Sequence, residues 1–155
     1  MLDHVWIASH IPHQGTMCLL DSVVNWDDRH IQCRANSHRN KDNPLRLRDR
    51  LGAACGIEYA AQAMAVHGAL LAPDDNGPPR AGFLVSVRGT KLHVLRLDDI
   101  DTDLDIEANC ISNSGDHILY QFNIHADGRL LIDGRAAVVL NAGSIIAAPI
   151  SGETQ

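Results

Sequence analysis

One carboxylate stands alone in a long apolar segment of the chain. Glu58 is the single acidic residue between Arg50 and Ala72, a range in which small and apolar residues dominate. A solvated helix face normally carries several charges, so this carboxyl indicates either acid–base chemistry or one exposed helix position. Gln62 follows by one turn on the same helix face. There it can orient the carboxyl, orient a substrate carbonyl or serve as a structural amide.

The segment around this carboxylate has the pattern of one long helix. Apolar residues recur at helical spacing from Arg50 to Ala72, and Pro73 ends the run, with Asp49 as the expected N-cap. Because the segment has few bulky or charged residues, we expect burial on most sides. Glycines at positions 52, 56 and 68 suggest that another backbone approaches the helix closely.

The other segments alternate as β-strands do, over the ranges 19–26, 30–36, 82–88, 91–97, 103–110, 118–125 and 130–140. Two strands, a long helix and an antiparallel meander predict an α+β domain, with an antiparallel sheet wrapped around the helix. The order lacks βαβ repeats, which disfavours a dinucleotide-binding fold. We expect one domain over residues 1–141 and a C-terminal tail at 142–155.

The composition is that of an ordinary globular protein. The 155 residues fit one domain, 45% are apolar, and no apolar run is long enough to span a membrane. The net charge of −6 argues against nucleic-acid binding. Cysteines at 18, 33, 55 and 110 form no CxxC pair, which indicates reduced thiols in the cytoplasm. The nine histidines show no HxH or HExxH spacing, so we expect no metal.

Basic residues gather just before the predicted helix. Six of them fall within seventeen residues: Arg34, Arg39, Lys41, Arg46, Arg48 and Arg50. A basic cluster on an acidic chain is either a solvated loop or a docking surface for an anionic partner or a phosphate.

Two segments carry a family resemblance. IPHQGTMCLLDSVV (11–24) and GIEYAAQAMAVHG (56–68) are similar to the LPHR-type motif and the E-A-x-A-Q helix motif of hotdog-fold 3-hydroxyacyl-carrier-protein dehydratases. The branch associated with aryl-polyene and related pigment pathways is the most similar. The likeness covers about residues 10–70, and beyond it only the strand pattern and the DGRLLIDGRA hairpin agree.

The resemblance implies a hotdog fold and, without a cofactor, dehydration of a 3-hydroxyacyl thioester to the trans-2-enoyl thioester. Glu58 matches the family carboxylate. Mainstream dehydratases carry a histidine in an HFPGxP loop, fourteen residues before that glutamate, where this chain has Pro44. We therefore expect His13, in the matched N-terminal motif, to be the base, with His38 as the second candidate. Without that role, His13 is a loop histidine and His38 a surface histidine.

The resemblance also implies surfaces for substrate and partners. We expect Gly56 and Cys55 to bind substrate, because N–H groups at the helix start can polarise the thioester carbonyl. We expect Gln62 to bind it through its side-chain amide, which can orient a carbonyl. The substrate is carried by an acyl carrier protein or by coenzyme A. An acidic carrier would dock on the basic residues Arg39, Lys41, Arg46, Arg48 and Arg50. Hotdog domains pair so that their sheets join and each site takes residues from both subunits, which implies a homodimer or a heterodimer with another hotdog subunit.

Two alternatives stay open. An acyl thioesterase on the same fold also uses a helix carboxylate, and the missing HFPG loop permits that interpretation. The other alternative is a non-catalytic partner subunit that shapes the acyl pocket of an active dehydratase.

Overall fold

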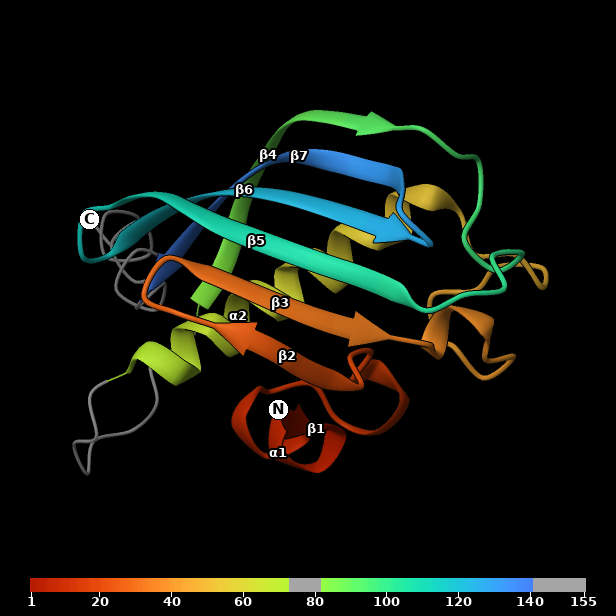
Figure 1. Ribbon diagram of the computed structural model, residues 1–155, viewed down its shortest axis with the longest axis horizontal. Coiled ribbons are helices and arrows are strands. Elements are labelled where there is room, and N and C mark those ends of the chain that lie inside the picture. Colours follow the sequence, from red (N-terminus) through yellow and green to blue (C-terminus); the bar gives the residue numbers. More distant parts are fainter. Residues whose placement is uncertain (73–81, 141–155) are drawn as a thin grey trace, which may run out of the picture.

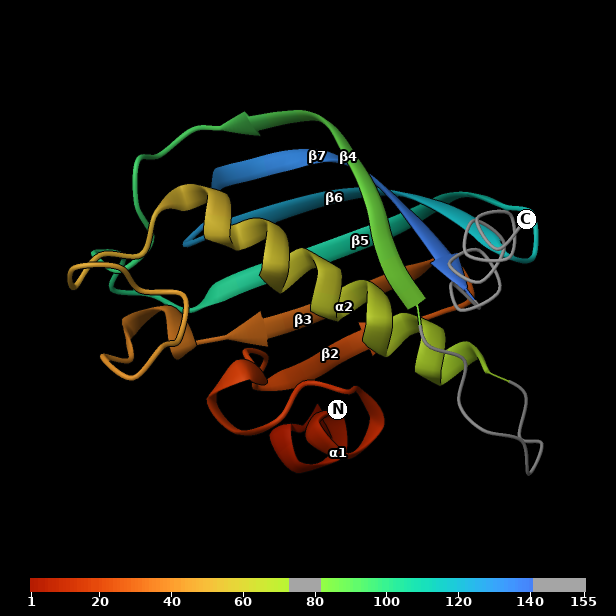
Figure 2. The same cartoon turned by 180° about the vertical axis from the view of Figure 1, so that it is seen from behind.

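The computed structural model describes residues 1–72 and 82–140 as one curved antiparallel sheet packed around a long helix (Figures 1 and 2). The strands are β1 Leu2–Asp3, β2 Ser22–Trp26, β3 His30–Ala35, β4 Gly82–Leu92, β5 Leu104–Asn113, β6 His117–Ala126 and β7 Arg129–Leu140. Their order in the sheet is β1-β2-β3-β5-β6-β7-β4. This confirms the predicted α+β architecture, whereas the predicted tail at 142–155 lies outside the described residues.

Helix α2, Gly56–Leu71, crosses the concave face of the sheet, and the short helix α1, His4–His10, lies beside β1 and β2 at one edge (Figure 2). Alternate side chains of each central strand point toward α2 and are buried, as Leu104, Ile106 and Ala108 are in β5. The core therefore lies between helix and sheet. Within the described residues, no helix is long and apolar enough to cross a membrane.

The glycines of the helix differ in their surroundings. A Cβ added to Gly56 would clash with Cδ1 of Ile132 and lie 3.2 Å from Cδ1 of Ile124. A Cβ added to Gly68 would meet no described atom within 4 Å. The predicted close approach therefore occurs at the start of the helix, and side chains of the sheet make it rather than another backbone.

Helix α2 begins at Gly56, six residues after the predicted start at position 50. A 3-10 turn, Ala53–Cys55, precedes it. Leu51 is held by the loop after β4, since Leu97 N–H donates to its carbonyl at 2.8 Å and its own N–H donates to Asp98 at 2.9 Å. These partners are more than forty residues away in sequence, so the local apolar pattern could not reveal them.

The same loop replaces part of a predicted strand. β4 ends at Leu92, and residues 93–97 belong to the loop that connects it to β5. An isolated β-bridge pairs Arg96 of this loop with Gly52. The break expected between the strands 82–88 and 91–97 is a bulge inside one continuous strand, where Gly89 has φ +60° and the pairing with β7 shifts register.

Asp49 is not the N-cap of α2 and lies in a tight turn instead. Arg48 and Asp49 have φ values of 54° and 60°, and Leu47 N–H donates to the carbonyl of Arg50 at 2.9 Å. Two successive residues in the left-handed region form a two-residue hairpin turn. This conformation costs a non-glycine residue about 1 kcal/mol or more. The turn leaves Arg48 and Arg50 exposed in front of the helix.

Candidate active site

Glu58 lies in the first turn of α2, opposite a histidine from the N-terminal segment. His13 follows α1, and its Nε2 atom lies 3.2 Å from Oε1 of Glu58. The two side chains are 26% and 33% exposed, so each keeps a surface that a substrate can reach. A single chain therefore brings together the predicted carboxylate and the preferred base.

Gln62 is fully buried and joins the two segments that carry this pair. Its Oε1 accepts the N–H of Leu19 at 2.9 Å, and its Nε2 donates to the carbonyl of Met17 at 2.7 Å. The same Nε2 donates to Oε1 of Glu58 at 3.3 Å. Both amide protons thus have protein acceptors. Sequence reasoning linked Gln62 to Glu58 but missed Leu19 and Met17, which lie more than forty residues from Gln62 and share no spacing signal with it.

A second tie joins the same segment to α2. Ser37 Oγ donates to the carbonyl of Leu19 at 2.7 Å and accepts from the hydroxyl of Tyr59 at 2.8 Å. Asn43 Nδ2 donates to that hydroxyl at 3.0 Å. Burial raises the pKa of the Tyr59 phenol, so it stays protonated as this network requires.

His38, the second candidate base, is fully buried and lies apart from the pair. Its Nε2 donates to the carbonyl of Ile100 at 3.0 Å, and burial lowers the pKa of its imidazole. No hydrogen bond or ion pair within residues 1–72 and 82–140 joins it to Glu58. It fastens the loop before the helix to the loop after β4.

The five basic residues expected to dock a carrier fall into two groups. Arg39 pairs with Asp103 at 2.7 Å, and Arg46 donates to the carbonyls of His38 and Asp49. The other three are exposed and form no ion pair with any described residue: Lys41, Arg48 and Arg50.

Two of the expected substrate-binding residues lie at the start of α2. Gly56 packs beneath Ile132, and its N–H already donates to the carbonyls of Ala53 and Ala54. Cys55 is half-buried, its N–H donates to Gly52 at 3.0 Å, and burial raises the pKa of its thiol. The backbone donors expected to polarise a thioester carbonyl are therefore engaged within the 3-10 turn.

The opposite end of α2 holds a second histidine, His67, which pairs with Tyr120. His67 Nε2 donates to the carbonyl of Asp27 at 2.9 Å, which leaves Nδ1 to accept from the hydroxyl of Tyr120 at 2.8 Å. Both side chains are buried. Burial lowers the pKa of His67 and raises the pKa of Tyr120, so both groups are held neutral.

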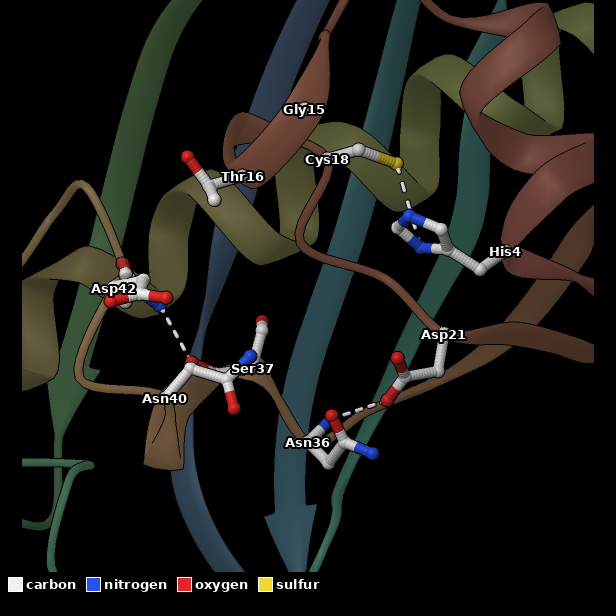
Figure 3. A pocket seen from close by; sticks show the side chains of 10 residues that line it. His4, Gly15, Thr16, Cys18, Asp21, Asn36, Ser37, Asn40 and Asp42 are labelled. Atoms are coloured by element: carbon white, nitrogen blue, oxygen red, sulfur yellow. Dashed lines mark hydrogen bonds between the residues drawn. The ribbon is translucent and has the colours of Figure 1, made fainter.

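A pocket of about 310 Å³, lined mostly by residues with polar side chains, lies beside the N-terminal segment (Figure 3). Its walls come from His4 and from parts of the ranges 15–21 and 36–43, and burial raises the pKa of one wall residue, Asp21. Neither catalytic candidate lines it, so it is separate from the pair. Within the described part of the chain, no three potential metal ligands gather in one place.

Comparison with known proteins places the chain in context. A family model described as ApeP-like, ApeP dehydratase, matches residues 5–145. No curated protein sequence matches. The solved dehydratase heterocomplex ApeI:P from Xenorhabdus doucetiae matches with a TM-score of 0.81 and 22% identity, over 93% of this chain and 96% of that chain.

Thioesterases match less well. A hypothetical thioesterase with coenzyme A from Streptococcus pneumoniae gives a TM-score of 0.57 and 11% identity, over 77% of this chain and 84% of that chain. A thioesterase from Haemophilus influenzae gives 0.58 and 10% identity, over 86% and 80%. At these identities the solved structures establish the fold, which is the expected hotdog fold.

Proposed function

The chain belongs to the ApeP-like dehydratase family, and from this premise we propose that it dehydrates a 3-hydroxyacyl thioester on an acyl carrier protein. The product is the trans-2-enoyl thioester of polyene-type or fatty-acid synthesis. The observation that carries the proposal is the contact of 3.2 Å between His13 and Glu58, with both side chains partly exposed.

The pair has the groups that this reaction needs. A base must remove a proton from C2, and an acid must protonate the hydroxyl on C3. In the reactive form, His13 Nε2 is unprotonated and Glu58 carries the proton. His13 takes the C2 proton and the C2–C3 double bond forms. The C3–O bond breaks as Glu58 protonates the C3 hydroxyl, which leaves as water. A proton then passes from His13 to Glu58 across their contact and restores the pair.

The start of α2 supplies the remaining requirement. Charge develops on the thioester oxygen as C2 loses its proton, and the positive end of a helix stabilises such charge. Since the N–H groups of Cys55 and Gly56 already have acceptors, we assign this effect to the helix dipole. We place the thioester beside Cys55, which keeps some exposed surface.

We propose that the carrier protein docks on Lys41, Arg48 and Arg50, because these cations are exposed in front of α2. The strained turn at Arg48 supports this proposal, since glycine would be favoured there if only the fold mattered. Arg48→Gly should therefore weaken carrier binding severalfold and keep or slightly raise stability. Carrier affinity and urea unfolding measure the two effects. Unchanged affinity would argue against docking at this turn.

We propose that β4 joins the sheet of a second hotdog subunit. β4 is an edge strand, and Phe83, Val85 and Leu92 on it are 46%, 57% and 48% exposed. An exposed apolar edge is a template for pairing with another strand. The partner is a copy of this chain or a different hotdog chain, and the solved relative named as a heterocomplex supports the second option. In that case this chain can also serve as a non-catalytic partner subunit.

The decisive experiment offers a 3-hydroxyacyl carrier-protein thioester to the purified chain and, in parallel, to Glu58→Gln. Mass spectrometry of the thioester should show an enoyl product that the variant does not form. Release of free acid would instead indicate a thioesterase. Product that forms only after a second hotdog chain is added, and that survives Glu58→Gln, would indicate a non-catalytic partner.

A further inference from the structure

We infer that Gln62 is a positioning residue that holds the Glu58 carboxyl against His13 and stabilises it as it gives up its proton. This role rests on the proposed dehydration. Of the three roles that the sequence left open for Gln62, it selects orientation of the carboxyl over contact with the substrate. It follows from three features: the fixed orientation of the amide, the shared acceptor atom and the position of a second tie nearby.

The amide orientation of Gln62 is fixed by its backbone partners. The N–H of Leu19 can only donate and the carbonyl of Met17 can only accept, and both lie within 2.9 Å of the amide. A flipped amide would set N–H against N–H and oxygen against oxygen. The nitrogen therefore faces Met17, and its second proton points to Glu58. Because the amide is fully buried, water does not compete for these bonds.

Oε1 of Glu58 consequently lies between two side chains, Gln62 Nε2 at 3.3 Å and His13 Nε2 at 3.2 Å. When Glu58 protonates the leaving hydroxyl, negative charge develops on this carboxyl. An N–H bond to a carboxylate is stronger than one to a neutral acid, so the contact with Gln62 strengthens during the reaction. Such a contact raises kcat rather than substrate affinity.

Ser37 provides a matched control. Its hydroxyl ties the same N-terminal segment to α2, through Leu19 and Tyr59, and forms no hydrogen bond with Glu58 in the described structure. Ser37→Ala therefore loosens the two segments without removing a donor from the carboxyl. Gln62→Met removes that donor and keeps a side chain of similar length.

Gln62→Met should lower kcat roughly 10- to 100-fold with a smaller change in KM. The pH profile of kcat should move upward by about one pH unit, because losing a donor disfavours the ionised carboxyl. Gln62→Glu, which keeps the acceptor for Leu19, should move the profile further, because it sets a like charge beside Glu58. Ser37→Ala should leave the profile in place. If the Gln62 variants lose activity without any shift in the pH profile of kcat, Gln62 has only a structural role, and the inference is wrong.

A titration without substrate separates this inference from the proposed function. The imidazole of His13, assigned by comparison with His13→Gln, can be followed by NMR in each variant. An upward shift of its titration in Gln62→Met, but not in Ser37→Ala, supports the positioning role even if no enoyl product forms. Equal titration in all three proteins overturns the role, whatever the turnover.

Discussion

Helix α2 engages a histidine near each of its ends, and the two contacts differ in completeness. At the N-terminal end, Glu58 and His13 lie 3.2 Å apart and are 33% and 26% exposed. At the C-terminal end, His67 and Tyr120 lie 2.8 Å apart and are 0% and 1% exposed.

The difference separates a structural histidine from a reactive one. Both ring nitrogens of His67 have protein partners, and burial favours its neutral form. The pair at Glu58 shares one contact and keeps surface for a substrate. Residue type and helical spacing do not distinguish these two environments, whereas access and unfilled hydrogen-bonding capacity do.

The largest contrast should come from disabling each contact in turn. Glu58→Gln or His13→Gln should reduce kcat roughly 10³-fold and change the free energy of unfolding by less than about 1 kcal/mol, because the pair is partly exposed. His67→Ala should do the reverse. It leaves the Tyr120 hydroxyl without a partner in the core and should cost about 2 to 4 kcal/mol of stability.

Steady-state kinetics and urea unfolding on the same preparations check this contrast. The folded fraction of His67→Ala should keep kcat within a few-fold of the parent protein. A His67→Ala protein that is folded but inactive would contradict the conclusion that His67 is structural and that only the pair at Glu58 is reactive.

Substitutions of the two glycines in α2 should show that the two ends of the helix also differ in how tightly they are packed. Gly56→Ala forces a Cβ against Ile132 and Ile124 and should cost roughly 1 to 3 kcal/mol. Gly68→Ala meets open space in the described structure and should gain about 0.5 to 1 kcal/mol, because alanine favours helix. Thermal unfolding measures both. If Gly56→Ala is as stable as Gly68→Ala, the sheet does not press on the start of the helix.

A smaller effect should appear in the pH dependence of stability. Burial lowers the pKa of His67 and His38 below the ordinary value of 6.5. The unfolded chain therefore binds protons near pH 6.5 while the native protein does not, so stability is complete above pH 6.5 and falls as the pH drops below it. Each histidine contributes at most about 1.4 kcal/mol per pH unit. Urea titrations between pH 5 and 8 should show a shallower slope for His67→Gln, and an unchanged slope would contradict the neutral assignment.

Sequence patterns predicted the parts of this fold that depend on local periodicity. Alternation located most strands, and the apolar run located α2 and placed Glu58 near its start. The pattern could not locate the first turn, because Leu51 bonds to Leu97 and Asp98 in a distant loop. The strand expected at 91–97 ended early because the same loop turns away to meet the segment before the helix.

For the candidate site, the sequence likewise predicted some residues and missed the partners of others. The lone carboxylate identified Glu58, and the motif resemblance led to His13, which the structure sets beside it. The burial of His38 was not foreseeable, because its partner Ile100 is 62 residues away. The ties of Gln62 to Met17 and Leu19 were equally hidden, since a backbone acceptor or donor has no sequence signature.

In the proposed mechanism, one chain contributes both His13 and Glu58 to a working site. Subunit complementation tests it most directly: His13→Gln and Glu58→Gln chains are co-expressed, and the mixed oligomers are assayed for enoyl product. The mixture should stay as inactive as either variant alone, because each chain carries one defective pair. Recovery of about a quarter of parent activity, as random pairing in a dimer would give, would contradict it and show that the pair forms between subunits.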